Sequence, residues 1–256
     1  MPPKFDLNAY IMRHVGNSHE WHVLPFLKPV TLPGILTVHL LMLLIGTSIL
    51  LFLFLVVYRK QDRVPSGITN MLEFFVVYIR DEIAIPNMGE KDGESFTPML
   101  CSLFFFILIC NLMGLFPIFT AATGNINVTG ALAYLIFILM VLGTLLRSGP
   151  KGIWHGLVPS ALPGFAKPIF FLLEVALLFI RCVALMMRLF ANMMAGHIVI
   201  MSFLGLCIMF GLGAAILAFP MAVLFYCMEI FVSFLQAYIF ILLSAIFIGH
   251  MYHPKH

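Results

Sequence analysis

The sequence predicts an all-α, polytopic membrane protein with about five transmembrane helices, an amphipathic surface helix and a long, strongly tilted C-terminal helical hairpin. Of its 256 residues, 62% are hydrophobic and 10% are charged, and the mean hydropathy is +1.08. Soluble domains are nearer 45–50% apolar and about 25% charged. Apolar runs of about twenty residues, the length that crosses a bilayer, recur along the chain. An almost wholly apolar stretch also runs from Pro168 to Pro220 with no proline between them.

The composition argues against several functional classes. The net charge of +3 is small, and because the charges lie in loops we expect no nucleic-acid partner. All five cysteines lie in apolar runs without CxxC spacing, so we expect neither a disulfide framework nor a metal site. No GxxxxGK[ST] fingerprint occurs. We therefore expect this chain to bind no nucleotide or other cofactor.

The first 35 residues are polar and punctuated by proline, which predicts an extracytoplasmic tail before a single transmembrane domain over residues 36–256. Within the tail, the sequence from His19 to His22 is interpreted as a solvated surface, since two histidines at this spacing lack further metal ligands. The first span is predicted from Val38 to Tyr58. The basic residues that follow, at 59–63, favour the cytoplasmic side.

The middle of the chain predicts a surface helix and two further spans. Apolar and charged residues share Ile68–Ile85 in an amphipathic pattern, which favours a helix on the membrane surface. A polar, flexible loop is expected over 86–98. The second and third spans are predicted over Met99–Ala122 and Ala131–Leu146, joined by the uncharged turn 123–130. Positive charge gathers in the loops assigned to the cytoplasm, and these residues are Arg59, Lys60, Arg63, Arg147, Lys151 and Lys167.

The last third predicts a hairpin of two unusually long helices. Pro168 suits a first helical turn, and a helix from there to Leu204 is about 37 residues, or ~55 Å, long. The second arm, Ala214–Gly249, is nearly as long. The hydrocarbon core is only about 30 Å thick, so both arms must be strongly tilted or bent. The break between them is expected at Gly205 or in Gly211-Leu212-Gly213.

Polar residues recur at helical spacing on both arms. Intervals of seven and four residues keep a set on one helix face, because seven residues advance the helix by about 700°, nearly two turns. The first-arm set is Glu174, Arg181, Arg188 and Asn192. The second-arm set, spaced i, i+3, i+7 and i+10, is Tyr226, Glu229, Ser233 and Gln236. Two polar stripes on two membrane helices predict a water-accessible path.

Folding the hairpin about its glycines brings polar residues of the two arms opposite each other. The pairs are Arg188 with Gln236, His197 with Glu229, and Glu174 with His250. One difficulty remains, because His197 lies nine residues from Arg188, about half a turn round a helix. Either the arms bend, or Arg188 faces a different partner while His197 faces Glu229.

Arg188 is the residue that most requires an explanation. A charge at bilayer depth costs roughly 2.5–3.5 kcal/mol on insertion scales, so such a residue is by default a functional hypothesis. Structural alternatives exist: Arg181 and Arg188 can snorkel to the interface, and Glu174 can be an interfacial acid. His197 and Gln236 can simply hydrogen-bond between helices. The position of Arg188 in the middle of its arm argues against snorkelling.

Three motifs carry a resemblance to a known family. The sequence Arg188-Leu-Phe-Ala-Asn-Met-Met-Ala-Gly196 resembles the signature of subunit a of the F-type ATP synthase. Leu235-Gln236-Ala-Tyr-Ile-Phe240 resembles the second signature of that family, and Asn111-Leu-Met-Gly-Leu-Phe-Pro117 resembles its N-L-x-x-x-x-P element. The similarity is strongest over residues 99–250, and the three motifs occur in the family's order.

The resemblance implies a role for each residue of the two stripes. Arg188 would be the essential arginine that faces the ring of c subunits. Glu174, Asn192 and Gln236 fall on polar positions implicated in the proton path. His197 and Glu229 occupy positions that hold Glu and His in many bacterial members, so this chain has the pair exchanged, an arrangement that also occurs in the family. Three further candidates for the path are Arg181, Ser233 and His250. Gly114 is a departure, since some relatives carry an acid there.

The resemblance implies a non-catalytic stator subunit whose partners are the c-ring, the peripheral-stalk b subunits and the lipid bilayer. Protons would enter near His197, Glu229 and Gln236 and leave toward the cytoplasm past Glu174 and His250, with Arg188 dividing the two half-channels. A bacterial plasma (inner) membrane is expected, with the N-terminus outside and the C-terminus in the cytoplasm; an organelle-encoded chain would look the same. The alternative is a secondary transporter or ion channel that uses Arg188 for an anionic substrate. The sequence leaves H⁺ versus Na⁺ open.

Overall fold

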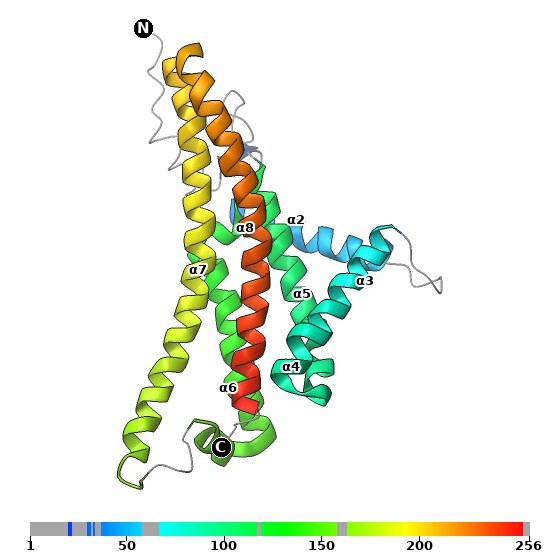
Figure 1. Ribbon diagram of the computed structural model, residues 1–256, viewed down its shortest axis with the longest axis vertical. Helices are drawn as coiled ribbons and strands as arrows, with labels where there is room; N and C mark the ends of the chain where they lie inside the picture. The colour runs from blue at the N-terminus through cyan, green and yellow to red at the C-terminus, as the bar shows by residue number, and fades with distance from the viewer. Residues whose placement is uncertain are drawn as a thin grey trace. The chain divides into compact units, whose positions relative to one another are not determined.

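The computed structural model describes residues 20–21, 30–31, 33, 37–57, 67–116, 119–157 and 163–252. It confirms the predicted all-α fold (Figure 1). A two-residue antiparallel pair comes first, in which Glu20 and Trp21 of β1 (Glu20–Trp21) lie opposite Thr31 and Val30 of β2 (Val30–Thr31). The remaining elements are helical: α2 (Val38–Phe52), η1 (Leu53–Val57), α3 (Ile68–Tyr78), η2 (Ile79–Ala84), α4 (Ile85–Met88), α5 (Glu90–Leu115), η3 (Ala122–Gly124), α6 (Ile126–Leu157), α7 (Lys167–Phe210) and α8 (Leu212–Tyr252).

The described residues contain five helices long and apolar enough to cross a membrane, which confirms the predicted number. They are Val38–Val56, Glu90–Leu115, Ile126–Leu146, Lys167–Cys207 and Ala218–Tyr252. Most of the predicted N-terminal tail, the basic residues at 59–63 and the C-terminal residues 253–256 lie outside the described residues. The assignment of the tail, the single transmembrane domain and the tilt of the hairpin stay predictions.

The expected flexible loop over residues 86–98 is wrong. Helix α4 runs to Met88, Gly89 reverses the chain with φ +82°, and α5 begins at Glu90. Glu90 and Asp92 lie in the first turn of α5, where negative charge interacts favourably with the helix dipole. Residues 90–98 are polar because this part of the helix extends beyond the apolar span. Their polarity does not indicate an irregular loop.

Two other boundaries differ from the prediction. The second span ends at Leu115 rather than at Ala122, and the chain then forms the short helix η3. The third helix is longer than predicted, because α6 begins at Ile126 and continues to Leu157 through a kink at Gly149, whose φ is +67°. Glycine adopts such a positive φ without the steric penalty of a side chain.

The chain divides into two compact units, each built from three segments. The first comprises Met1–Leu51, Phe106–Val128 and Leu189–Gln236; the second comprises Phe52–Phe105, Thr129–Arg188 and Ala237–His256. In the first unit, Val38 and Met42 of α2 pack with Met113 of α5 and Ala122 of η3. Gly46 supports this contact, since a Cβ there would lie 3.2 Å from the Cys110 sulfur.

A buried hydrogen bond ties the end of α5 to η3. The hydroxyl of Thr123 donates to Oδ1 of Asn111 over 2.8 Å, and both residues are 0% exposed. Within the described residues, Nδ2 of Asn111 has no partner. Because Gly114 has no side chain, Ala121 can approach, and a Cβ on Gly114 would lie 2.7 Å from the Cβ of Ala121. Asn111 and Gly114, two residues of the N-L-x-x-x-x-P element, therefore help to fix how α5 ends.

We expect Thr123→Val to destabilise the protein by about 1–3 kcal/mol, because it leaves the Asn111 carbonyl buried without a donor. The measurement is the thermal unfolding midpoint of the detergent-solubilised protein. Thr144→Val is the matched control: Thr144 is also buried, but its hydroxyl donates only to the Met140 carbonyl of its own helix. Equal midpoints for the two variants would contradict this assignment.

The second unit places the amphipathic helix α3 beside α5. Phe75 packs against Phe104 and Phe105, with ring centroids 5.6 and 6.0 Å away. The opposite face of α3 is apolar and exposed, with Met71 at 53% and Phe74 at 63%. The structure confirms a helix at this position, and its exposed apolar face suits the predicted place on the membrane surface.

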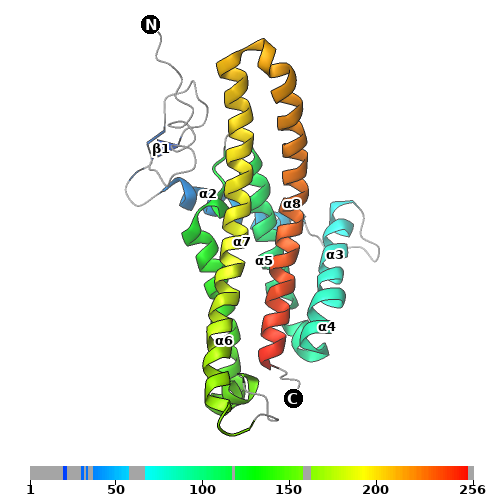
Figure 2. The same ribbon diagram turned by 60° about the vertical axis from the view of Figure 1, so that its left-hand side comes forward.

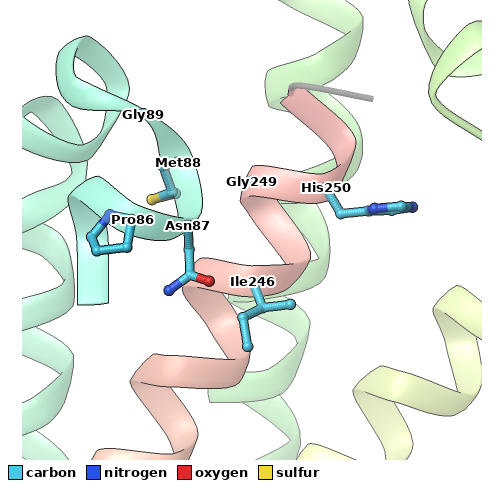
Figure 3. Close-up of a pocket in the computed structure, with 7 residues that line it drawn as sticks. All are labelled: Pro86, Asn87, Met88, Gly89, Ile246, Gly249 and His250. Carbon is cyan, nitrogen blue, oxygen red and sulfur yellow. The ribbon is translucent and has the colours of Figure 1, made fainter. Parts of the chain in front are cut away.

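In the same unit the last turns of α8 lie against the chain around α4. Gly249 faces the backbone carbonyl of Asn87, and a Cβ on Gly249 would overlap that oxygen (Figure 3). Tyr252 follows in the same helix; its hydroxyl donates to the Leu139 carbonyl over 3.4 Å, and its ring meets Phe96 edge-on at 5.6 Å. The C-terminal end of α8 is thus held by contacts with three other elements.

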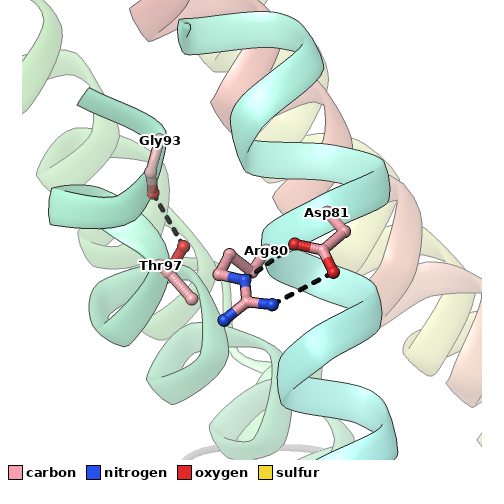
Figure 4. A network of polar contacts seen from close by, with 4 residues as sticks. All are labelled: Arg80, Asp81, Gly93 and Thr97. Carbon is pink, nitrogen blue, oxygen red and sulfur yellow. Dashed lines mark hydrogen bonds and ion pairs between the residues drawn. The ribbon is translucent and has the colours of Figure 1, made fainter. Parts of the chain in front are cut away.

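A surface ion pair lies on η2, next to α5 in the same unit (Figure 4). The Arg80 guanidinium contacts Asp81 with Nε 2.7 Å from Oδ1, and its hydrogen bond holds the pKa of that carboxyl below its ordinary value. On α5, Thr97 donates to the Gly93 carbonyl over 2.7 Å. Because the pair is exposed, it contributes little to stability.

Helices α7 and α8 form the predicted hairpin. The chain reverses at Gly211, whose φ is +67°, and this was one of the two predicted break points. The helices have 44 and 41 residues, so at 1.5 Å per residue they are about 66 and 62 Å long. In the first unit, the C-terminal half of α7 and the N-terminal half of α8 run side by side (Figures 1 and 2). The rings of Phe203 and Phe225 pack in a tilted arrangement with centroids 5.5 Å apart.

Candidate functional site

The predicted polar residues of the hairpin fall into two groups, one in each compact unit. The first unit holds Asn192, His197, Tyr226, Glu229, Ser233 and Gln236. The second unit holds Glu174, Arg181, Arg188 and His250. Each group is described within its own unit.

The second-arm stripe is buried in the first unit although α8 exposes many apolar side chains. Glu229, Ser233 and Gln236 are only 6%, 0% and 4% exposed, whereas Phe231 is 66% exposed. This confirms that the three residues share one helix face. Within the described residues, Oγ of Ser233 and Nε2 of Gln236 have no hydrogen-bond partner. Buried polar groups are normally paired, so unpaired ones call for a water, an ion or a functional explanation.

Asn192 of α7 and Glu229 of α8 meet at one small pocket. Its volume is about 130 Å³, and Asn192, Gly196, Met228 and Glu229 are among the residues that line it. Nδ2 of Asn192 is buried and has no partner within the described residues. Polar groups around a space large enough for water are the arrangement in which a water can bridge them. The structure thus brings together one residue of each predicted stripe.

Gly196 makes room for the Glu229 carboxylate. A Cβ built on Gly196 would overlap both carboxylate oxygens of Glu229, so only glycine allows the side chain to lie against α7 in this way. Sequence patterns alone did not mark Gly196 as a site residue. The available signal was its place in the Ala195-Gly196-His197 sequence, at the level where the hairpin pairing puts Glu229.

The predicted pairing of His197 with Glu229 remains a prediction. The structure describes the backbone of His197, in α7, but not its side chain. Its neighbour Gly196 contacts Glu229, so His197 lies at the expected level of the hairpin. Tyr226 is half-buried, one turn before Glu229 on α8.

In the second unit, Glu174 and Arg181 form an ion pair along α7. The Nη2 of Arg181 lies 2.9 Å from Oε1 of Glu174, which confirms that residues seven apart share a face. Glu174 is 7% exposed, and a buried charge requires such a partner. Arg181 also lies over the Phe247 ring of α8, 5.7 Å from its centroid. Arg181 therefore connects the predicted exit carboxylate to the last turns of α8.

For the proton path that the resemblance implies, we expect Arg181→Gln to lower proton pumping several-fold and to destabilise the protein, because it leaves a buried carboxylate without its counter-charge. Adding Glu174→Gln should restore part of the loss, giving a coupling energy of about 0.5–3 kcal/mol in a double-mutant cycle. The readouts are the initial pumping rate in vesicles and the thermal unfolding midpoint. Lys167→Gln, which removes a positive charge from the first turn of the same helix, is the control. Strictly additive losses would show that the pair does not act as a unit.

Arg188 lies on the open face of α7. Leu185 and Leu189 on either side are 1% and 0% exposed, whereas Arg188 is exposed and forms no ion pair with the described residues of its own unit. His250, near the end of α8, is also exposed. The structure therefore presents both residues at the surface of this chain, while the stripe of Glu229, Ser233 and Gln236 is buried. No group of three or more metal-ligating side chains occurs in the described part of the chain.

Comparison with known proteins identifies the family. The family model described as ATP synthase A chain matches residues 40–249. The chain is 39% identical to ATP synthase subunit a of Anaeromyxobacter dehalogenans (strain 2CP-C), over 94% of this chain and 67% of that protein. It is 42% identical to ATP synthase subunit a 2 of Chlorobium luteolum, over 93% of this chain and 74% of the relative. For ATP synthase subunit a of Myxococcus xanthus the identity is 39%, over 92% and 84%.

The match covers the region that carries the three motifs and every polar residue of the two groups except His250. It confirms the resemblance stated from the sequence and agrees with five apolar helices of membrane-spanning length. Members of this family are membrane subunits that take part in proton translocation without being the catalytic unit. The chain belongs to the ATP synthase subunit a family and is a non-catalytic, multi-pass membrane subunit of the proton-translocating sector.

Proposed function

We propose that this chain forms two proton half-channels against a ring of c subunits, with Arg188 between them. Protons enter from the outer side through the pocket at Asn192 and Glu229 and pass along Ser233 and Gln236. They then protonate a carboxylate on a neighbouring ring subunit. After the ring rotates, the proton leaves toward the cytoplasm past Glu174. The only bonds that this chain makes and breaks are those between its own polar groups and the translocated proton.

The observation that carries this proposal is the buried stripe of unpaired polar groups. Within the described residues, Asn192, Ser233 and Gln236 each have a buried nitrogen or oxygen without a partner, and Glu229 shares a pocket with Asn192. An unmade hydrogen bond in the interior costs about 1–3 kcal/mol. A row of such groups is explained if transient waters and protons occupy it. His197 lies at the same level of the hairpin and would give the path a second titratable group.

Arg188 has the properties of a barrier rather than of a carrier. Its guanidinium keeps its proton under all physiological conditions, so it cannot relay one. It is exposed on α7, where it can attract an ionised carboxylate on the ring. Once that carboxylate on the ring is protonated it is neutral, so Arg188 no longer attracts it. The membrane potential drives the cycle with about 2.3 kcal/mol per proton per 100 mV.

On the exit side the ion pair of Glu174 and Arg181 supports the assignment. The pair keeps a carboxylate in the interior of its unit, where it can take a proton arriving from the ring. In a bacterial cell this requires the plasma (inner) membrane, with the N-terminus outside and the C-terminus in the cytoplasm, and peripheral-stalk b subunits that hold the chain still. H⁺ is the proposed ion, although the choice between H⁺ and Na⁺ depends largely on the ring.

Purification of the tagged chain from its native membrane tests the assembly. We expect it to co-purify in mild detergent with a ring of small two-helix subunits and with the soluble ATPase sector. A secondary transporter or channel that uses Arg188 for an anionic substrate would purify without the ring and would take up that anion in liposomes. Purification without any ring would overturn the proposed function.

A further inference from the structure

The last turn of α8 places a tyrosine in a notch on α6. The hydroxyl of Tyr252 lies against Gly143, and a Cβ built on Gly143 would overlap that oxygen. The same hydroxyl donates to the carbonyl of Leu139, one turn earlier on α6, over 3.4 Å. All three residues belong to the second compact unit. Only glycine at position 143 leaves room for the hydroxyl, so the tyrosine and the notch fit each other.

Two further contacts hold the same end of α8 within this unit. The Tyr252 ring meets the Phe96 ring of α5 edge-on, with centroids 5.6 Å apart. One turn earlier on α8, Gly249 lies so close to the backbone carbonyl of Asn87 that a Cβ would overlap it (Figure 3). Met251, between the two contact residues of α8, is buried at 2% exposure. A single turn of α8 therefore contacts three other parts of the chain.

The packing beside these contacts is incomplete. A pocket of about 420 Å³ lies between the 86–89 turn and three residues of α8, which are Ile246, Gly249 and His250 (Figure 3). Side chains that line an open space lack contact atoms on one side and are held less firmly there. The position of the end of α8 therefore depends strongly on the few contacts that Tyr252 and Gly249 make.

The position of α8 along its own axis matters because of the residues that the helix carries. Glu229, Ser233 and Gln236 form its buried stripe, and the Glu229 carboxylate fits tightly against Gly196. If α8 slid by the length of one residue, the whole stripe would move by about 1.5 Å. A displacement of about 1 Å from the productive geometry can slow a reaction by about 100-fold. A ring that turns against the hairpin exerts force on it, so α8 requires a stop.

We propose that Tyr252 is a positioning residue: its fit into the notch at Gly143 is the stop that keeps α8 in place while the ring turns under load. The proposal rests on the proposed function, in which the stripe on α8 passes protons to a turning ring. For α8 to slide, the hydroxyl must either press into the backbone at Gly143 or lose its bond to the Leu139 carbonyl. The stop is needed most when an opposing proton gradient resists rotation of the ring.

The test uses inverted membrane vesicles, in which ATP-driven pumping acidifies the interior and the growing gradient loads the ring. At equal amounts of assembled complex, Tyr252→Ala should start to pump at nearly the wild-type rate. At steady state it should sustain a proton concentration ratio several-fold smaller, because α8 slides under load and the ring steps without moving a proton. Tyr252→Phe, which keeps the ring at Phe96 and loses the hydroxyl, should lie between. Tyr134→Ala is the matched control: Tyr134 is 62% exposed on α6 in the same unit, and this variant should reach the wild-type ratio.

A reversible cross-link distinguishes positioning from a general contribution to folding. In the double variant Gly143→Cys with Tyr252→Cys, a short bifunctional methanethiosulfonate reagent can bridge the gap that the tyrosine ring fills, forming one disulfide with each cysteine and releasing methanesulfinate. Without the reagent the steady-state ratio should be small. The bridge should raise it to nearly the wild-type value, and dithiothreitol should lower it again. The wild type and the two single-cysteine variants set the baseline for the five native cysteines.

Two outcomes would overturn the stop: Tyr252→Ala sustains the wild-type ratio, or it loses the initial rate and the steady-state ratio by the same factor and the cross-link repairs neither. If Tyr252→Ala fails to assemble, Tyr252→Phe and the cross-linked variant give the same test. Arg188→Ala in parallel vesicles separates the two hypotheses. Normal pumping in Arg188→Ala would overturn the proposed function itself. Lost pumping there, together with the wild-type ratio in Tyr252→Ala, would overturn the stop alone.

Discussion

Arg188→Ala should abolish coupling between ATP hydrolysis and proton movement. Without the fixed positive charge, an ionised ring carboxylate can pass the barrier and the two half-channels connect, so we expect pumping in inverted vesicles to fall by more than tenfold, a change of at least about 1.4 kcal/mol. Passive proton permeability, measured after the soluble ATPase is removed, should stay high. Arg188→Lys should recover little, because a lysine loses its proton readily in a poorly hydrated site.

Met187→Ala is the control for this experiment. Met187 is the preceding residue on α7 and its side chain is 42% exposed. Its truncation therefore removes an exposed side chain without removing a charge. It should pump like the wild type. Normal coupling in Arg188→Ala, with the complex assembled, would show that the arginine does not separate the half-channels and would remove the central element of the proposed function.

Glu229→Gln should give the second large loss. The amide keeps the size of the side chain and cannot exchange a proton, and positioned acid–base groups typically contribute about 10²–10⁴-fold in rate. We therefore expect pumping to fall by about 100-fold, while Glu229→Asp keeps a substantial part. The readout is the initial rate of ATP-driven acidification at equal amounts of assembled complex. Glu73→Gln on α3 removes a carboxylate that belongs to the other compact unit and does not line the pocket at Glu229, and it should have no effect.

Gly196→Ala tests the position of the Glu229 carboxylate separately from its charge, because this variant leaves every titratable group in place. The new methyl group would overlap the Glu229 carboxylate and displace it from the pocket it shares with Asn192. We expect a loss comparable to Glu229→Gln, relieved in part when the shorter Glu229→Asp is added. Gly130→Ala is the control, since its Cβ would lie 3.3 Å from the flexible Met186 sulfur. Full activity in Gly196→Ala would mean that the position of the Glu229 carboxylate is not critical.

Much of this fold follows from patterns within single segments. Apolar length predicted the five spans, and glycine predicted the reversal at Gly211. Boundaries failed where a helix outlasted its apolar run: α5 starts at Glu90 and α6 runs on to Leu157. Hydropathy indicates which part of a helix is in contact with lipid. The backbone hydrogen bonds of the helix continue into the polar residues on either side of that part. The expected flexible loop over 86–98 failed for this reason.

The sequence by itself determined which polar residues interrupt the apolar helices, which of them share a helix face, and that Arg188 is one of them. Helical period and residue type are local properties and can be read from one chain. Only the tertiary structure decided that Glu174 is neutralised by Arg181, that Arg181 reaches Phe247, and that Gly196 accommodates the Glu229 carboxylate. It also decided that the 86–89 turn and the end of α8 enclose a pocket. These contacts join segments distant in sequence, and their geometry depends on how whole helices pack.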